Sequence, residues 1–164
     1  MIKKKVSMLG SFAVGKTSLV QQYVRSIFSE KYHTTIGVKI DQKIVIVDHQ
    51  EVNLMLWDIH GEDDYQKVKP AYVMGSSAYF IVIDGTRRNT IETALELQEM
   101  AAKVSEGAPF IVLINKADLK EEWEVTETDI QSLKEKGMTV ITTSAKDGFQ
   151  VEEAFLKLSQ QMMK

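Results

Sequence analysis

The chain has 164 residues, about the length of one domain, and carries 20 basic against 23 acidic side chains, which gives a formal charge of −3. This near balance argues against nucleic acid as a partner. The absence of cysteine excludes disulfides, thiolate metal sites and lipid attachment to a thiol within these residues. A hydrophobic content of 44% predicts a packed core, yet no apolar run approaches the ~18 residues that span a bilayer. We therefore expect a soluble, cytoplasmic, monomeric protein with a single domain over residues 1–164.

Short apolar runs alternate with amphipathic ones along the chain. In chain order, the pattern predicts a strand at 6–9, a helix at 16–25, strands at 38–47, 52–58 and 78–84, a helix at 90–104, a strand at 110–114, a helix at 126–136, a strand at 138–142 and a helix at 151–163. The strands at 38–47 and 52–58 leave no room for a helix between them, which favours an antiparallel hairpin. The other strands alternate with helices, and the clearest are apolar throughout, as is typical of strands covered on both faces. The sequence therefore predicts an α/β fold with a six-stranded, mostly parallel sheet and one antiparallel edge strand.

Ligands of such sheets bind beyond the carboxyl ends of the strands, so the residues that follow each strand are the site candidates. The first strand leads into Gly10-Ser11-Phe12-Ala13-Val14-Gly15-Lys16-Thr17, which fits the pattern G-x-x-x-x-G-K-[ST]. Glycines let the backbone wrap closely around phosphates, whose charge is bound by successive N–H groups and the helix N-terminus. A glycine-rich turn can match by chance, but the strand before it and the helix after it favour a nucleoside triphosphate loop. The predicted phosphate-binding residues are Ala13, Val14, Gly15, Lys16, Thr17 and Ser18, with Lys16 on the β- and γ-phosphates and Thr17 on Mg²⁺.

Three further positions are predicted to meet the metal ion and the γ-phosphate. Asp58 ends the strand at 52–58 and is expected to hold Mg²⁺ through water, with a capping role as the alternative. Gly61 lets a backbone N–H approach the γ-phosphate. Thr35, in the polar connection at 32–37, can complete the metal shell and order that connection when the γ-phosphate is present. Taken alone, this stretch would be interpreted as an ordinary connecting loop.

The segments that follow the last two strands predict which base is bound. They are Asn115-Lys116-Ala117-Asp118 and Ser144-Ala145-Lys146. The carboxylate of Asp118 can accept from both N1–H and the exocyclic amine of guanine, a donor pair that adenine lacks. Lys116 can lie along the base, Asn115 and Ser144 can tie the two loops together, and the N–H of Ala145 suits guanine O6. The expected ligands are therefore GTP and GDP together with Mg²⁺.

In these motifs, in their order and spacing, the sequence resembles the Ras superfamily of small GTPases over essentially its whole length. Trp57-Asp58, Tyr72 and Ile36-Gly37-Val38 are most similar to the Rab branch. The resemblance implies a P-loop NTPase G domain with a six-stranded sheet and about five helices. It also implies an active GTP form, an inactive GDP form and hydrolysis by an in-line water. It places Phe28 and Tyr32 at the nucleotide.

The resemblance further implies two switch segments, at 32–37 and 61–72, which bind effectors, exchange factors and GTPase-activating proteins. It implies catalytic roles for Lys16, Thr35, Gly61 and Glu62. No lipid-carrying cysteine tail is present in this chain, so we expect recruitment to a membrane, where it occurs, through a partner or a missing tail.

The sequence departs from the family pattern at the catalytic positions. Phe12 stands where the family keeps a small residue beside the γ-phosphate, Ile59-His60 replace a Thr-Ala pair, and Glu62 replaces the Gln that orients the attacking water. These departures predict slow hydrolysis, and they leave a GTP-binding scaffold with little turnover as the alternative. An adenine-nucleotide kinase or ATPase is a third possibility, which leaves both base-recognition segments unexplained. Arg87-Arg88 is interpreted as a solvated face and not as part of the site.

Overall fold

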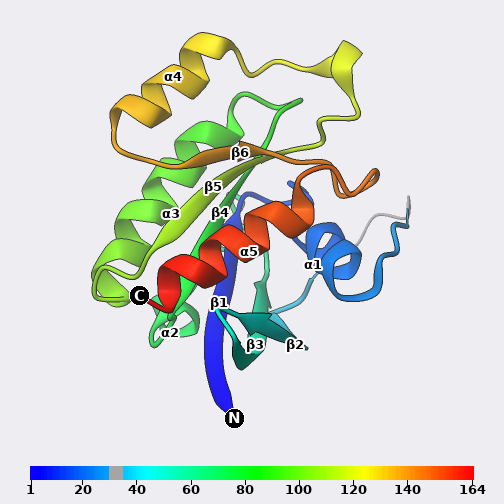
Figure 1. Cartoon of the computed structure of the whole chain (residues 1–164). Coiled ribbons are helices and arrows are strands. Elements are labelled where there is room, and N and C mark those ends of the chain that lie inside the picture. The colour runs from blue at the N-terminus through cyan, green and yellow to red at the C-terminus, as the bar shows by residue number, and fades with distance from the viewer. Residues whose placement is uncertain (30–34) are drawn as a thin grey trace.

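The computed structural model describes residues 1–29 and 35–164. In this part of the chain the elements are β1 (Ile2–Gly10), α1 (Lys16–Arg25), β2 (Val38–Val47), β3 (Gln50–Ile59), α2 (Pro70–Val73), β4 (Ala78–Asp84), α3 (Thr90–Val104), β5 (Phe110–Asn115), the 3₁₀ helix η1 (Lys120–Glu122), α4 (Glu127–Glu135), β6 (Val140–Thr142) and α5 (Val151–Met162) (Figure 1).

All of the strands belong to one sheet, with the order β2-β3-β1-β4-β5-β6. β2 and β3 pair antiparallel, and every other neighbouring pair is parallel, which confirms the predicted fold class. Asp48 and His49 form the tight turn between β2 and β3, with positive φ angles of 48° and 67°. Two consecutive residues of this kind give a turn whose twist matches that of the flanking strands. The hairpin therefore places β2 at the edge of the sheet.

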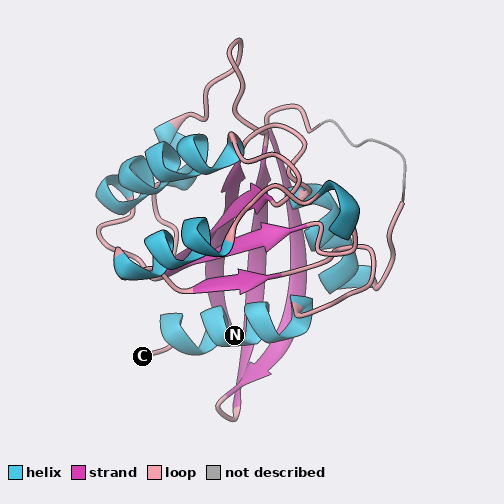
Figure 2. Ribbon diagram, turned by 90° about the horizontal axis from the view of Figure 1, so that it is seen from above, coloured by secondary structure: helices cyan, strands magenta, loops and turns pink. Residues whose placement is uncertain are grey.

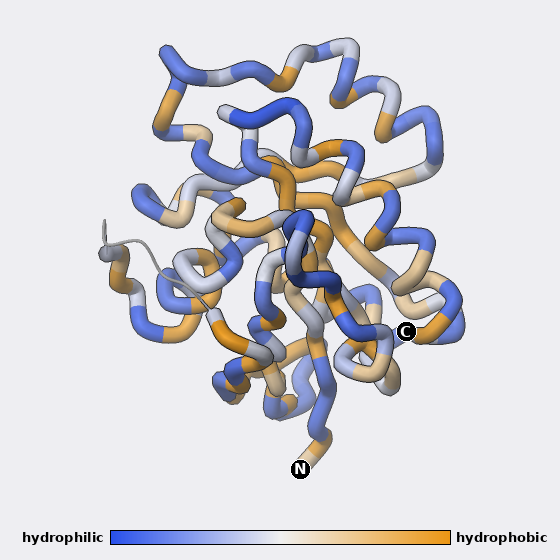
Figure 3. Tube along the Cα trace, turned by 180° about the vertical axis from the view of Figure 1, so that it is seen from behind, coloured by the Kyte–Doolittle hydropathy of each residue, from blue (hydrophilic) through white to orange (hydrophobic). Residues whose placement is uncertain are grey.

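The helices lie in two layers, one on each face of the sheet (Figure 2). α1 and α5 pack against one face, where Tyr23 stacks on Phe155 with ring centroids 3.8 Å apart. α2, α3 and α4 pack against the other face. Each fully buried Leu, Ile or Phe contributes about 1.5–3 kcal/mol relative to exposure, and such residues fill the central strands (Figure 3). The sheet is therefore a rigid base for the loops at its carboxyl edge.

The structure differs from the predicted elements mainly at their ends. β1 begins at Ile2, four residues before the predicted start, because Lys3–Lys5 pair in parallel with Asn53–Met55 of β3. Local sequence does not reveal this pairing, since three consecutive lysines carry no apolar pattern. α2 and η1 were not predicted, because helices of 4 and 3 residues are too short to show a helical period. In the described residues, no helix combines the length and apolarity needed to cross a membrane.

Candidate functional site

A pocket of about 330 Å³ opens at the carboxyl edge of the sheet. Its walls come from the loops after β1, β3, β5 and β6 and from the segments that flank residues 30–34. The lining residues are Phe12, Ala13, Gly15, Lys16, Thr17, Ser18, Phe28, Ser29, Thr35, Gly61, Asn115, Lys116, Asp118, Leu119, Ala145 and Lys146. Segments that lie more than 100 residues apart in the sequence, such as the phosphate loop and the loop after β5, therefore face one space.

Side chains hold the carbonyl groups of the loop between β1 and α1. The carbonyls of Ser11, Phe12, Ala13 and Val14 accept hydrogen bonds from Lys16 Nζ, Arg87 Nη2, Lys116 Nζ and Asn115 Nδ2, at 3.2, 2.7, 3.0 and 3.1 Å respectively. In a planar trans peptide the N–H points opposite to the carbonyl, so this arrangement fixes the directions of the intervening N–H groups. Successive N–H groups of this kind at a helix N-terminus form an anion-binding cradle.

Left-handed backbone at two positions produces the sharp turn of this loop. Gly15, with φ of 103°, has no room for a side chain, because a Cβ there would lie 2.3 Å from Nδ2 of Asn115. Ala13 has φ of 65° although it carries a side chain, which costs about 1–2 kcal/mol. The loop holds this strained shape through the side-chain bonds to its carbonyls.

Lys16, the first residue of α1, is the charged group at the centre of the cradle. Its side chain is only 6% exposed. Burial lowers the pKa of Lys16 to about 8; the nearby Asp58 carboxylate opposes this shift and Arg87 adds to it. A buried ammonium is stabilised by an anion at its side, so this position favours a ligand with several negative charges.

Three oxygen-bearing side chains meet beside Lys16. The hydroxyl of Thr17 donates to Oδ2 of Asp58 at 2.6 Å and lies 2.9 Å from the hydroxyl of Thr35. Since Thr17 has a single proton and gives it to Asp58, Thr35 is the donor of the second bond. Oδ1 of Asp58 is buried, and no donor among the described residues reaches it. Burial raises the pKa of Asp58, and the bond from Thr17 lowers it in part. Carboxylate and hydroxyl oxygens of this kind suit Mg²⁺, so the residues present fit the predicted ion.

The loops after β5 and β6 are tied together at the other end of the pocket. The Ser144 hydroxyl donates to Oδ1 of Asp118 at 2.9 Å and accepts the N–H of Asp147 at 3.1 Å. Oδ1 of Asn115 accepts from the hydroxyl of Thr143 at 3.1 Å and from the N–H of Ala145 at 3.2 Å. The N–H of Ala145, which the sequence suggested for guanine O6, is thus bonded within the protein, because the amide nitrogen of Asn115 holds Val14 and leaves its oxygen facing this loop.

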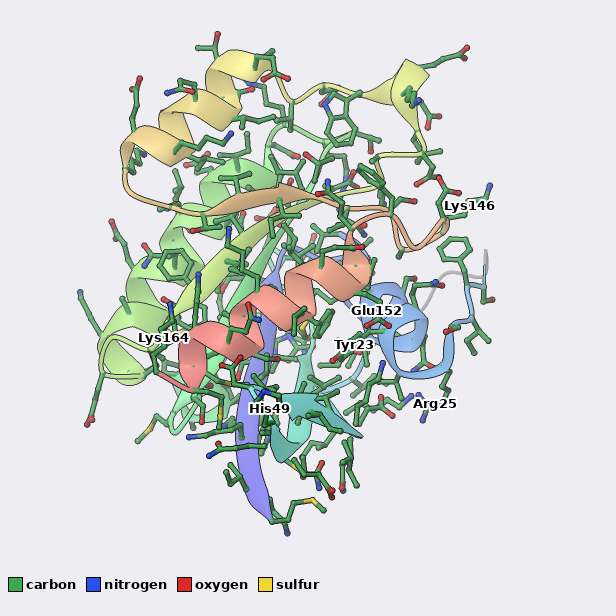
Figure 4. The ribbon with its side chains drawn as sticks, in the orientation of Figure 1. Tyr23, Arg25, His49, Lys146, Glu152 and Lys164 are labelled. Atoms are coloured by element: carbon green, nitrogen blue, oxygen red, sulfur yellow. The ribbon has the colours of Figure 1, made fainter. Side chains whose placement is uncertain are left out.

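The remaining predicted nucleotide contacts lie around the rim. Phe28 lines the pocket, and Lys146 lies in the loop between β6 and α5 on the α1 side of the molecule (Figure 4). Tyr32 lies outside the described residues. Ser29 and Leu119 also line the pocket and were not predicted. Their positions directly after Phe28 and Asp118 were the only signal in the sequence.

The segment after β3 is joined to the phosphate loop through its backbone. The N–H of Phe12 donates to the carbonyl of Glu62 at 3.0 Å, and the N–H of Glu62 donates to the carbonyl of Gly10 at 3.1 Å. Gly61 allows this contact, because a Cβ there would lie 2.4 Å from Cα of Phe12. The carboxylate of Glu62 accepts the N–H of Val68 at 3.2 Å, and Glu62 does not line the pocket, whereas Phe12, which is 36% exposed, does.

The loop after β4 contains functional candidates that sequence reasoning missed. Asp84, 1% exposed, forms ion pairs with Lys116 at 2.8 Å and Arg87 at 2.9 Å. Arg88 forms an ion pair with Asp129 of α4 at 2.8 Å. The interpretation as a solvated face is confirmed for Arg88, whose side chain is 64% exposed, and is wrong for Arg87, which is 39% exposed and also donates to the Phe12 carbonyl of the phosphate loop. Asp84 ends a buried strand, and this signal could have indicated it.

The ion pairs of Asp84 should contribute to the free energy of unfolding in a pH-dependent way. Burial alone would raise the pKa of Asp84, but hydrogen bonds from Lys116, Thr86 and Arg87 together lower it below its ordinary value. A carboxylate with a lowered pKa stabilises the fold above its unfolded-state pKa, and this stability is lost as the pH falls through the folded-state pKa. Asp84→Asn should lower the free energy of unfolding by about 1–2 kcal/mol at pH 7.

Urea unfolding of both proteins at several pH values measures this effect. The difference between wild type and Asp84→Asn should shrink as the pH falls below ~4. A constant difference over the whole range would show that the loss does not come from the charge of Asp84.

Known proteins resemble this chain over nearly its full length. The family model described as Ras family matches residues 5–164. Ras-related protein Rab-2B of Dictyostelium discoideum is 33% identical over 162 residues, which cover 98% of this chain and 80% of that protein. Ras-related protein Rab-7b of Mus musculus is 33% identical over 164 residues, covering 97% and 82% respectively. Ras-related protein RABA4a of Arabidopsis thaliana is 33% identical over 153 residues, covering 92% and 68%.

Proposed function

Since the chain belongs to the Ras family of small GTPases, which hydrolyse GTP to GDP and act as nucleotide-dependent switches, we propose that the pocket at the carboxyl edge of its sheet binds GTP and GDP with Mg²⁺. The matches to Rab-related proteins confirm the predicted branch and do not favour a scaffold without turnover. The observation that carries the proposed site is the meeting of Lys16, Thr17 and Asp58 at one end of a pocket whose other end is formed by Asp118 and Ala145.

The two ends of the pocket suit the two ends of a nucleotide. The cradle around Lys16 binds phosphate oxygens, while Asp118 accepts hydrogen bonds from guanine. Oδ1 of Asp118 accepts a hydrogen bond from the Ser144 hydroxyl. This bond orients the carboxylate, which can only accept hydrogen bonds from the base. An adenine ligand would place an acceptor, N1, against this carboxylate. The geometry therefore supports GTP over ATP.

Thr17, Thr35 and Asp58 are the residues that would hold Mg²⁺. When bound, the ion neutralises charge on the phosphates. Thr35 follows residues 30–34 directly and lines the pocket, with its hydroxyl 2.9 Å from that of Thr17. Its hydroxyl is therefore the point at which the first switch segment can respond to the nucleotide.

We propose that GTP hydrolysis is slow, because the Glu62 carboxylate is hydrogen-bonded to the backbone of Val68. Glu62 accepts the N–H of Val68 at 3.2 Å, and this bond must open before the carboxylate can orient a water molecule. An ionised Glu also cannot donate to the transferring phosphoryl group, as a Gln can. Lys16 and the N–H of Gly61 are the groups that remain to stabilise the charge of that phosphoryl group.

The regulators and effectors, the monomeric state and the cytoplasmic location stay predictions. The surface that supports effector binding runs from Ile36, which is 88% exposed, to Ile40 on β2. The backbone of this region is joined to the residue that precedes the second switch segment, because the N–H of His60 donates to the carbonyl of Gly37 at 2.8 Å. A nucleotide-dependent change at Thr35 can therefore reach both switch segments.

A hydrogen-exchange experiment tests the switch. With Mg²⁺ and a non-hydrolysable GTP analogue, the amide hydrogens of Thr35, Ile36 and Gly37 should exchange at least about tenfold more slowly than with GDP, because the γ-phosphate orders this segment. Thr35→Ala should abolish that difference, and Thr35→Ser, which keeps the hydroxyl, should retain it. Equal exchange of wild type in both nucleotide states would contradict a switch at Thr35.

A further inference from the structure

One arginine outside the pocket is attached to the loop that would bind the phosphates. We propose that Arg87 is a positioning residue for nucleotide binding, and that it acts by holding the Phe12 carbonyl while Asp84 holds its guanidinium. This inference rests on the proposed function, since it concerns the same pocket. Nothing in the motifs of the pocket indicates Arg87, which lies 75 residues from Phe12 in the sequence.

The guanidinium of Arg87 bridges two groups. Its Nε donates to Oδ2 of Asp84 at 2.9 Å, and its Nη2 donates to the carbonyl of Phe12 at 2.7 Å. The planar fork of a guanidinium can make both bonds at once in a fixed geometry. The side chain of Arg87 is 39% exposed, but the two oxygen atoms that it holds belong to a buried carboxylate and to the phosphate loop.

Asp84 is itself fixed, so it is a firm anchor for Arg87. It ends β4, its side chain is 1% exposed, and Oδ1 accepts the hydroxyl of Thr86 at 2.7 Å. Oδ2 also accepts Lys116 Nζ at 2.8 Å. The backbone of Arg87 is held as well, because its N–H donates to the Asp84 carbonyl at 2.9 Å and its own carbonyl accepts the hydroxyl of Thr90 at 2.7 Å.

The position that Arg87 holds is the strained part of the phosphate loop. Two peptide planes flank Ala13, whose φ is 65°, and their carbonyls belong to Phe12 and Ala13. Arg87 holds the first carbonyl and Lys116 holds the second at 3.0 Å. Since each carbonyl points opposite to the N–H of its own plane, holding the Phe12 carbonyl also holds the N–H of Ala13. Release of Arg87 frees this plane while Lys116 still holds the other.

The choice of base rests on Asp118, which does not take part in the bond from Arg87 to Phe12, although Lys116 shares Oδ2 of Asp84 with Arg87. Asp118 is oriented by Ser144, and Asn115 and Lys116 reach the phosphate loop directly. Loss of the Arg87 side chain should therefore weaken the binding of the phosphates and leave the choice of base unchanged. A substitution that merely loosens the fold would reduce both the affinity for the nucleotide and the preference for guanine.

Competition with a fluorescent GDP derivative in the presence of Mg²⁺ tests this inference, with GDP and inosine diphosphate as competitors. Inosine diphosphate lacks the exocyclic amine of guanine, so the ratio of the two affinities reports on Asp118. Arg87→Ala should weaken GDP binding about three- to tenfold, less than the full effect of a charge-assisted hydrogen bond because Arg87 acts on the phosphates through the loop, and should leave the affinity ratio unchanged. Arg88→Ala is the matched control, because Arg88 makes the same kind of ion pair with Asp129 and does not contact the loop.

The outcomes separate the inference from the function on which it rests. Weaker GDP binding by Arg87→Ala alone, with an unchanged ratio, supports the positioning role. Equal GDP affinity for wild type and Arg87→Ala would overturn it, as would a loss of base preference in step with the loss of affinity. A wild type that binds neither nucleotide would instead overturn the proposed function, and the inference with it.

Discussion

Asp118→Asn should reverse the base preference of the protein, lowering its affinity for GDP by about 10³-fold and making xanthosine diphosphate the better ligand. The cause is the loss of a hydrogen-bond acceptor in a position that the structure fixes. The Ser144 hydroxyl accepts the N–H of Asp147 and donates its own hydrogen bond to residue 118. An Asn in this position therefore turns its oxygen towards Ser144 and its NH₂ group towards the base, where it faces the N–H groups of guanine. Xanthine offers a carbonyl oxygen there instead.

Calorimetry with GDP and xanthosine diphosphate measures this change. Asp147→Asn is the matched control, since it makes the same substitution on an exposed side chain three residues after Ser144. The control should bind GDP as wild type does. An Asp118→Asn variant with unchanged GDP affinity would show that the base does not bind at this end of the pocket.

Hydrolysis should respond to changes at Phe12 and Glu62. Phe12 lines the pocket at the phosphate loop, and we expect its ring to obstruct an arginine that a partner would insert there. A GTPase-activating domain with such an arginine should therefore accelerate wild type only slightly, whereas Phe12→Gly should respond by about 10³-fold or more. Without any partner, Glu62→Ala should hydrolyse GTP about tenfold more slowly than wild type, because the carboxylate can accept from the attacking water only after its bond to the N–H of Val68 opens.

Single-turnover assays of preloaded protein measure both effects. Phe12→Leu, which keeps a bulky side chain, is the control for Phe12→Gly and should stay unresponsive to the activating domain. An activating domain whose arginine is replaced by alanine should accelerate none of the variants. Strong acceleration of wild type through the partner's arginine would contradict the role given to Phe12, and equal rates for wild type and Glu62→Ala would remove Glu62 from catalysis.

The sequence predicted the fold and most of the pocket because both depend on local patterns. Apart from the connection between α1 and β2, each predicted binding motif follows a strand, and parallel strands bring their carboxyl ends to one edge. This rule is enough to place Lys16, Gly61 and Asp118 around one space, although they lie far apart in the chain. The start of α4 also depends on nearby residues alone: the Thr126 hydroxyl accepts the N–H of Asp129, and the Asp129 carboxylate accepts the N–H of Thr126.

The features that sequence missed depend on pairs of distant residues. The bond from Arg87 to the Phe12 carbonyl joins positions 75 residues apart, and nothing in the residues around Arg87 indicates a backbone carbonyl as its partner. Likewise, the hydrogen bond from the N–H of Val68 to the Glu62 carboxylate depends on the path of the chain between these two residues. Side chains that bind backbone atoms of another loop leave no periodic pattern, so only the folded structure reveals them.

One experiment tests both the selectivity for guanine nucleotides and the hydrolysis of GTP. The purified protein is loaded from an equimolar mixture of GTP and ATP, free nucleotide is removed, and the bound nucleotide is identified by chromatography over time. The pocket predicts that only guanine nucleotide is retained and that GTP converts slowly to GDP in a single exponential, with Mg²⁺ required. Retention of ATP, or GTP that stays intact over many hours with Mg²⁺ present, would contradict a GTP-hydrolysing switch.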